Sequence, residues 1–157
     1  MDSQTIETVT DLIDLMNKTD PLSKKEQDRL YQSHRESQKI DFLAPESVQQ
    51  AQVKAIEKRQ LERKESVLNN LWQKSLVKDN QDDLRLHAAL TIEFFKEYLK
   101  TGEAPPPASP LRVAILLKKR RDKELERQFL ASWSRHFCGA IGTGYQKLDA
   151  RYEKLRP

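Results

Sequence analysis

The sequence predicts an all-α protein, an elongated bundle of about six helices in which a Pro-rich linker precedes a basic C-terminal helical hairpin. Apolar residues recur at spacings of three and four along much of the chain, which is the period of amphipathic helices. Gly occurs only 4 times in 157 residues, and runs of β-branched residues are too few to place strands. The hydrophobic fraction is 37% and the charged fraction 33%, against about 45–50% and about 25% in average globular domains. This balance favours an extended bundle over a compact sphere.

The first two helices are indicated by apolar spacing and by capping residues. Residues 3–17 carry apolar side chains every three or four positions, and Ser3 is a candidate N-cap. Ser23 and Glu26 form the S-x-x-E pattern of a capping box, which predicts that a second helix begins there. The apolar face of this second helix is thin, so the helix is expected to need neighbours for its stability.

The middle of the chain predicts one long helix and one core helix. Pro45 suits the first turn of a charged helix near residues 45–78, which resembles a solvent-exposed, salt-bridge-laced helix or a coiled-coil arm. Trp72 is expected to lie in a core rather than to stack on a base. Asp83 lies at the start of a further helix, which is the most apolar of the chain, and Gly102 is placed to end it.

A Pro-rich segment divides the chain. Residues 103–110 read EAPPPASP, and consecutive prolines favour an extended polyproline conformation that spaces rather than packs. We therefore predict an N-terminal helical region over residues 1–102, a linker over residues 103–110, and a basic helical hairpin over residues 111–157.

The prediction of a basic C-terminal part depends mainly on residues 110–137. Their pattern fits one helix with an apolar stripe on one side and cationic residues on the other. Arg120, Lys123 and Arg127 follow each other at i, i+3 and i+7, on the side opposite the stripe. Contact with the phosphates of a nucleic acid is the functional interpretation of such a row. A solvated face whose charge is damped by neighbouring glutamates is the structural alternative.

The positive charge of the protein belongs to its last third. Residues 110–157 carry 12 Lys and Arg against 5 Asp and Glu, a net charge of +7, whereas the whole chain has +4. This asymmetry favours a polyanion, an acidic protein surface, or docking against the acidic remainder of the chain itself. The side chains expected to contact a nucleic acid or an acidic partner are Arg120, Lys123, Arg127, Arg135, Lys119, Arg121, Lys147 and Arg151.

The residues offer no catalytic set and no site for a metal or a cofactor, and we expect no enzyme. The three histidines are scattered and Cys138 is the only cysteine, so neither a metal cluster nor an internal disulfide is indicated. The glycines of residues 139–144 match no nucleotide-binding pattern. The longest apolar run, Val113–Leu117, is far shorter than the roughly 20 residues of a membrane span, and no secretory signal is apparent. We expect a cytoplasmic protein.

Two functions fit these features. The first is a non-enzymatic helical adaptor or accessory protein that binds another protein or a larger assembly, because thin apolar faces are often completed by partners. The alternative is an accessory or regulatory protein that binds DNA or RNA through the basic hairpin. A homodimer is compatible with either function. Whether residues 20–45 are ordered without a partner is left open by the sequence.

Overall fold

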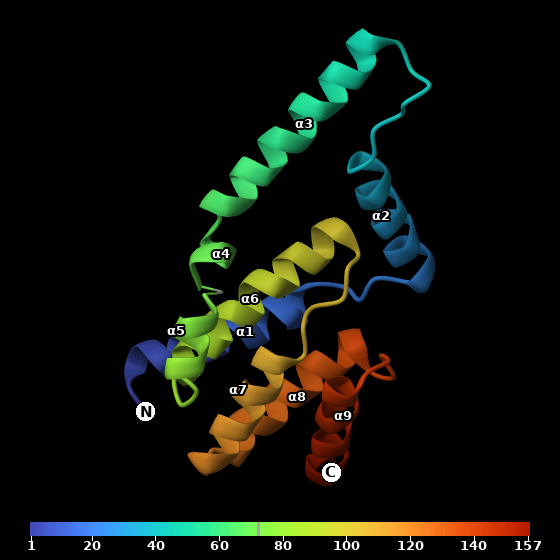
Figure 1. Ribbon diagram of the computed structural model, residues 1–157. Helices are drawn as coiled ribbons and strands as arrows, with labels where there is room; N and C mark the ends of the chain where they lie inside the picture. Colours follow the sequence, from blue (N-terminus) through green and yellow to red (C-terminus); the bar gives the residue numbers. More distant parts are fainter. Residues whose placement is uncertain (72) are drawn as a thin grey trace.

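A computed structural model describes residues 1–71 and 73–157, and it confirms the all-α prediction. The described residues form nine helices rather than about six, and no strand. The helices are α1 (Ser3–Lys18), α2 (Lys24–Ser37), α3 (Glu46–Glu65), α4 (Val67–Leu71), α5 (Lys74–Asp79), α6 (Leu84–Thr101), α7 (Ala108–Lys119), α8 (Lys123–Phe137) and α9 (Thr143–Leu155). Two parts are visible in Figure 1: a packed body below, and an arm made of α2 and α3 above it.

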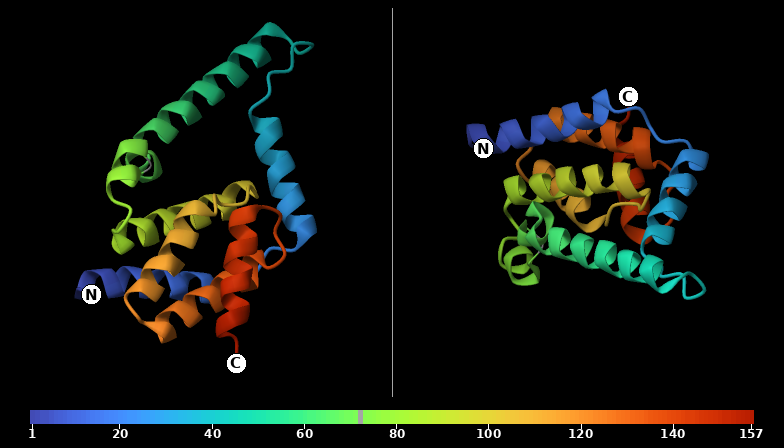
Figure 2. Two further views of the ribbon diagram at one scale, coloured as in Figure 1. Left: turned by 60° about the horizontal axis from the view of Figure 1, so that its bottom comes forward. Right: turned by 90° about the horizontal axis from the view of Figure 1, so that it is seen from above.

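One hydrophobic core holds α1, α6, α7, α8 and α9 together. Trp133 of α8 and Phe95 of α6 are almost fully buried at its centre, with Leu12 of α1 and Leu148 of α9 in the same cluster. Figure 2 shows α1 and α6 lying alongside the C-terminal helices in both views. The first and last thirds of the chain therefore share one core, which buries the apolar faces of α1 and α6.

The first helix forms as predicted, but with a different cap. The Asp2 carboxylate accepts a hydrogen bond from the Thr5 N–H at 2.7 Å, so α1 is capped one residue before the expected Ser3. Its apolar face, which includes Val9 and Met16, is buried. α1 therefore contributes to the core through the stripe that its spacing predicted.

The Pro-rich segment packs against the core, so the prediction that it only spaces is wrong. Pro105 is buried, and its carbonyl accepts a hydrogen bond from the Tyr145 hydroxyl of α9. Pro107 lies so close to Gly144 that a Cβ on Gly144 would come within 2.6 Å of the proline ring. The absence of a side chain at Gly144 thus lets α9 lie directly on this segment.

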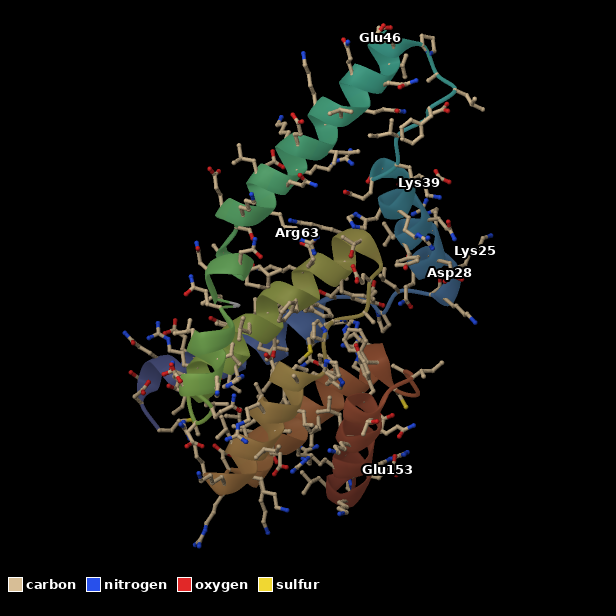
Figure 3. All side chains as sticks on the ribbon, in the orientation of Figure 1. Lys25, Asp28, Lys39, Glu46, Arg63 and Glu153 are labelled. Carbon is tan, nitrogen blue, oxygen red and sulfur yellow. The ribbon has the colours of Figure 1, made fainter. Side chains whose placement is uncertain are left out.

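The predicted long helix near residues 45–78 is broken into α3, α4 and α5. Ser66 ends α3 with extended backbone angles, φ −67° and ψ 149°. The Ser66 hydroxyl donates to the Arg63 carbonyl at 2.8 Å and accepts from the Asn69 N–H at 3.3 Å, so it closes one helix and begins the next. Trp72, for which a core position was predicted, lies outside the described residues. α3 itself has no buried residue, and its side chains project outward along its length (Figure 3).

Gly102 fixes the base of the arm. It ends α6 in the left-handed conformation, φ 69°, as the sequence predicted. The Gln27 side-chain amide of α2 donates to the Gly102 carbonyl at 3.1 Å, and a Cβ at Gly102 would lie 2.4 Å from the Gln27 carbonyl oxygen. Only glycine combines this backbone conformation with this close approach. The N-cap half of the capping box that begins α2 is confirmed, because Ser23 Oγ accepts from the Glu26 N–H at 3.1 Å, while the Glu26 carboxylate accepts from the Ser23 hydroxyl at 3.1 Å.

Candidate binding groove between α7, α8 and α9

The single helix predicted over residues 110–137 is two antiparallel helices joined by a short turn. α7 ends at Lys119 and α8 begins at Lys123. Arg120 and Lys123 therefore belong to different helices, and the row of Arg120, Lys123 and Arg127 on one helix face does not exist. The apolar spacing continues across the turn, which is why periodicity alone indicated one helix.

The turn has the hydrogen bonds of a Schellman motif. The Asp122 N–H donates to the Leu117 carbonyl at 3.2 Å, and the Arg121 N–H donates to the Lys118 carbonyl at 2.9 Å. The Asp122 carboxylate then accepts from the Leu125 N–H at 3.0 Å and caps α8. The residue that usually takes the left-handed position of this motif is glycine, but here it is Arg121, with φ 61°. A strained arginine of this kind is typical of functional surfaces.

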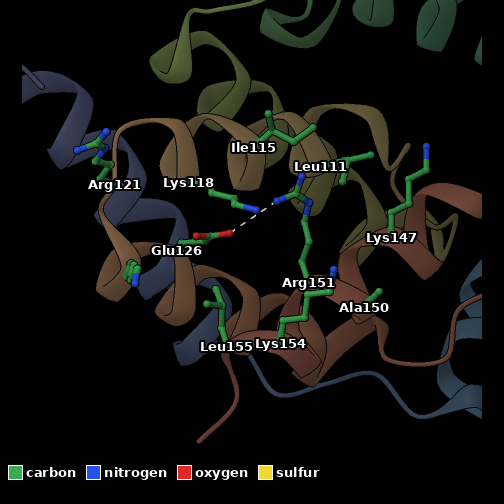
Figure 4. Close-up of a pocket in the computed structure, with 11 residues that line it drawn as sticks. Leu111, Ile115, Lys118, Arg121, Glu126, Lys147, Ala150, Arg151, Lys154 and Leu155 are labelled. Carbon is green, nitrogen blue, oxygen red and sulfur yellow. Dashed lines mark ion pairs between the residues drawn. The ribbon is translucent and has the colours of Figure 1, made fainter.

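α9 packs beside this pair of helices and completes a groove. The groove encloses about 750 Å³, within the range of ligand-binding clefts, and Figure 4 shows its walls. The residues that line it are Leu111, Ile115, Lys118, Arg121, Lys123, Glu126, Lys147, Ala150, Arg151, Lys154 and Leu155.

Aliphatic side chains form the apolar part of the groove. Leu111 and Ile115 lie one turn apart on α7, and Ala150 and Leu155 lie on α9. Leu111, Ile115 and Leu155 are only half-buried, although Leu111 and Leu155 pack against the core. These side chains would lose water contact if an apolar group entered the groove, and each buried methylene contributes about 0.8 kcal/mol.

Cationic side chains surround this apolar part. The groove is lined by Lys118, Arg121, Lys123, Lys147, Arg151 and Lys154, but by a single carboxylate. Among the described residues, Lys123, Lys147 and Lys154 form no ion pair. Their charge is thus not compensated by a carboxylate of the described residues, and the groove has a local excess of positive charge that attracts anionic groups.

Glu126 is the exception, and it is buried. Only 3% of its surface is exposed, and its Oε1 lies 3.8 Å from Nη1 of Arg151. Burial raises the pKa of Glu126 above its usual range, while the charges of Arg151 and Lys118 lower it in part. Both cations extend toward this carboxylate in Figure 4. Glu126 therefore orients the inner cations of the groove and leaves the outer ones free.

The structure divides the predicted contact residues into two sets. Four of them line the groove, namely Arg121, Lys123, Lys147 and Arg151. The other four lie elsewhere. Lys119 Nζ pairs with Asp82 at 3.3 Å, Arg127 pairs with Glu124 at 2.7 Å, and Arg120 is exposed at the end of α7.

Arg135 has a structural role that the sequence did not indicate. Its Nη1 donates to the carbonyls of Met16 and Asn17 at 3.2 and 3.1 Å, at the C-terminal end of α1. The Ser132 hydroxyl donates to the Asn17 side chain at 2.8 Å beside it. Arg135 therefore satisfies carbonyls that α1 leaves without partners, and it interacts favourably with the helix dipole.

Sequence reasoning missed Lys118, Lys154 and Glu126 as groove residues. Lys118 continues the row of Leu111 and Ile115 on α7, at i, i+4 and i+7, and this row lines a groove only because α9 packs beside it. Lys154 continues the row of Lys147 and Arg151 on α9, and that spacing is a signal that could have found it. Nothing in the sequence indicates that Glu126 is buried while its neighbour Glu124 is exposed.

Comparison of the chain with protein-family models, with curated proteins and with solved structures gives no match. The fold and the groove thus define the class, a small all-α protein with a cation-lined apolar groove. Within residues 1–71 and 73–157, no helix is long and apolar enough to cross a membrane. In the same described part of the chain, no group of three His, Cys, Asp or Glu side chains is placed to hold a metal ion.

Proposed function

We propose that this protein is a non-enzymatic helical adaptor that binds a partner protein through the groove between α7, α8 and α9. The observation that carries this proposal is the composition of the groove, which combines aliphatic side chains with six cations and one buried carboxylate. The complementary partner segment carries apolar side chains flanked by Asp or Glu.

The physical roles of the two kinds of side chain differ. Burial of the partner's apolar residues against Leu111, Ile115 and Leu155 supplies affinity, as in other complexes where a segment lies in a helical groove. The exposed lysines accelerate association and select for acidic segments, more than they add affinity. Binding is therefore expected to weaken with added salt, but not to vanish.

A synthetic helix tests this function directly. The probe is a fluorescent peptide of about 14 residues, or four turns, with leucines on one face and glutamates on the other. Its binding to the full chain is followed by fluorescence anisotropy. The double variant Lys147→Glu/Lys154→Glu reverses two exposed groove charges and leaves Glu126 with both of its neighbouring cations, Arg151 and Lys118. We expect its dissociation constant to rise about tenfold or more, which corresponds to about 1.4 kcal/mol.

The matched control is Lys24→Glu/Lys25→Glu, which makes the same change of net charge at the exposed start of α2. This control should bind the probe as the unaltered protein does. A peptide with lysines in place of the glutamates should bind poorly. Equal weakening by the two double variants, or no binding of the acidic helix at all, would show that the groove is not the site.

The alternative function, binding of DNA or RNA, is favoured by one observation. The end of α7 and the turn after it bring Lys118, Lys119, Arg120 and Arg121 together at the surface, all four exposed. Lys119 and Arg120 lie outside the groove, so phosphate contact with these two side chains does not require entry into the groove. The test is binding of a labelled duplex and a labelled single strand at low salt, since counterion release makes such binding fall steeply with salt. The variant Arg120→Ala, which alters no groove residue, should weaken nucleic-acid binding but not binding of the acidic helix.

A further inference from the structure

The arm presents an exposed apolar pair at its apex. The apex is the connection between α2 and α3, residues 38–45. Phe42 is 79% exposed and Leu43 is 98% exposed, whereas a large apolar side chain in the core is almost fully buried. Adjacent apolar side chains that extend into water are unfavourable unless a partner covers them.

Hydrogen bonds hold the apex in a defined shape. The Gln49 amide of α3 donates to the carbonyls of Phe42 and Ala44 at 3.0 and 2.8 Å, and the Asp41 N–H donates to the Gln52 side chain at 2.9 Å. The Asp41 carboxylate accepts from the Leu43 N–H at 3.0 Å. A fixed backbone loses less conformational entropy on binding, so the apex is preorganised to present its apolar pair.

The apex has the chemistry that the groove selects. Asp41 and Glu46 lie beside the apolar pair, and Lys39 is the one cation of residues 38–50, so this segment has a net charge of −1. Figure 3 places Lys39 and Glu46 at the two ends of the connection. The segment is thus apolar, acidic and exposed, while the groove is apolar and cationic.

The apex cannot reach the groove of its own molecule. In Figure 1 the apex lies at the far end of the arm, and α7, α8 and α9 lie at the opposite end of the body. The arm is joined to the body at Gly102 through Gln27 and where α4 contacts α6, and Arg59 of α3 donates to the Ser37 carbonyl of α2. An apex can therefore meet a groove only on another molecule.

We propose that the apex of one copy docks into the groove of a second copy, with Phe42 and Leu43 against the aliphatic side chains. This inference rests on the proposed function of the groove, and it names a second copy of this chain as a partner. Each copy has one apex and one groove, so the contact is head-to-tail and produces chains, or rings if the geometry closes. A contact made by so short a segment falls at the low end of interface sizes, below about 1,200 Å², so the association is weak and reversible.

The experiment uses three forms of the full chain. The apex variant is Phe42→Ser/Leu43→Ser, and the groove variant is Lys147→Glu/Lys154→Glu; all four side chains are exposed, so both should fold normally, as circular dichroism and thermal unfolding will verify. Sedimentation velocity over a series of concentrations reports the mass. The unaltered protein should assemble as its concentration rises, into a closed ring of two or more copies or into longer chains, and each variant alone should stay monomeric.

A mixture of the two variants provides the decisive measurement. The apex variant retains an intact groove and the groove variant retains an intact apex, so an equimolar mixture can form one junction and no more. The mixture should give a dimer that does not grow further. The control Ile141→Ser, which removes an apolar side chain that is 96% exposed but lies outside the groove, should assemble as the unaltered protein does.

Three results would overturn the inference: a monomeric unaltered protein at every concentration, assembly that persists in either variant, or a mixture that stays monomeric. If the acidic synthetic helix still binds the groove in any of these cases, the proposed function stands and only the second copy is excluded as the partner. If the helix also fails to bind, both proposals fall.

Discussion

The body and the arm use the same residue types in opposite ways. Leu12 of α1 is completely buried, whereas Leu61 of α3 is 57% exposed and Leu43 of the apex 98% exposed. The difference lies in the residues that surround each leucine. The apolar neighbours of Leu12 repeat at three and four and form a stripe, whereas charged residues surround Leu61. A leucine is buried when its helix offers a whole face, and the arm offers none. Its order depends on the contacts at its ends and at its apex.

Matched leucine truncations should separate the two regions most strongly. Leu12→Ala leaves a cavity in the core and should lower the free energy of unfolding by about 2–5 kcal/mol. Leu61→Ala removes an exposed side chain and should change it by less than about 0.5 kcal/mol. Urea unfolding followed by circular dichroism measures both. Similar losses for the two variants would mean that α3 is packed far better than the exposure of its side chains indicates.

Gly102→Ala should loosen the arm from the body. The added Cβ meets the Gln27 carbonyl at 2.4 Å, and the left-handed conformation disfavours alanine, so we expect a loss of more than about 1 kcal/mol. Hydrogen exchange should show faster exchange of the α2 amides, with little change in α8. Gly139→Ala is a suitable control, because its φ is also positive, 77°, but nothing lies within 4 Å of its Cβ position. Equal effects of the two substitutions would exclude a role for the close contact.

Acid should weaken the body through His87, which is buried, and His136, which is partly buried. Burial lowers the pKa of His87 and of His136 below 6.5, and Nδ1 of each ring has no hydrogen-bond partner in the described part of the chain. The unfolded chain then binds more protons than the folded one. The free energy of unfolding should therefore fall as the pH falls below about 6.5, by up to about 1.4 kcal/mol per pH unit for each histidine. Urea titrations at several pH values from about 7.5 to about 5 measure the slope.

Single variants show which histidine causes the fall of the free energy of unfolding with pH. His136→Gln should reduce it, even if the variant is less stable at neutral pH, because the slope depends on protons and not on absolute stability. Glu126 acts in the opposite direction, since its pKa is raised and the folded state gains a proton as the pH falls toward 4.5. An unchanged slope in His136→Gln would contradict the assignment to this histidine.

Glu126→Gln should produce the smallest effect, confined to the groove. The substitution keeps the size of the side chain and removes its negative charge, so Arg151 and Lys118 are no longer compensated. We expect affinity for the acidic synthetic helix to rise about twofold to fivefold, or up to about 1 kcal/mol, the range of a partly exposed charge pair. Glu124→Gln, at an exposed carboxylate outside the groove, is the control. Weaker binding by Glu126→Gln would show that Glu126 positions the cations more than it cancels them.

The body could be predicted from the sequence because its helices carry complete local signals. The terminator at Gly102 acts within a few residues of its position, and the apolar stripes of α1 and α6 follow the helical period. The break between α7 and α8 could not be predicted. Its Schellman motif has Arg121 where glycine is the usual signal, and the apolar spacing passes through it.

The groove could be predicted only in part, because it depends on how separate helices meet. Lys147 and Arg151 were indicated by their spacing on one helix, but Lys118 reaches the groove only because α7 reverses at Arg121. Arg135 has the same charge and a similar sequence context, yet it binds the carbonyls of α1. Charge and spacing identify cationic residues, whereas the packing of neighbouring helices determines whether their charge is free.

The most direct test of the central claim is a map of where an acidic segment binds. Backbone amide resonances of the full chain are followed by nuclear magnetic resonance while the leucine–glutamate helix is added. If the helix binds in the groove, the amide resonances of Ile115, Lys118, Ala150 and Lys154 should shift, and those of α1 and α2 should not. Shifts confined to the arm, or spread evenly over the basic surface without the groove, would contradict the claim.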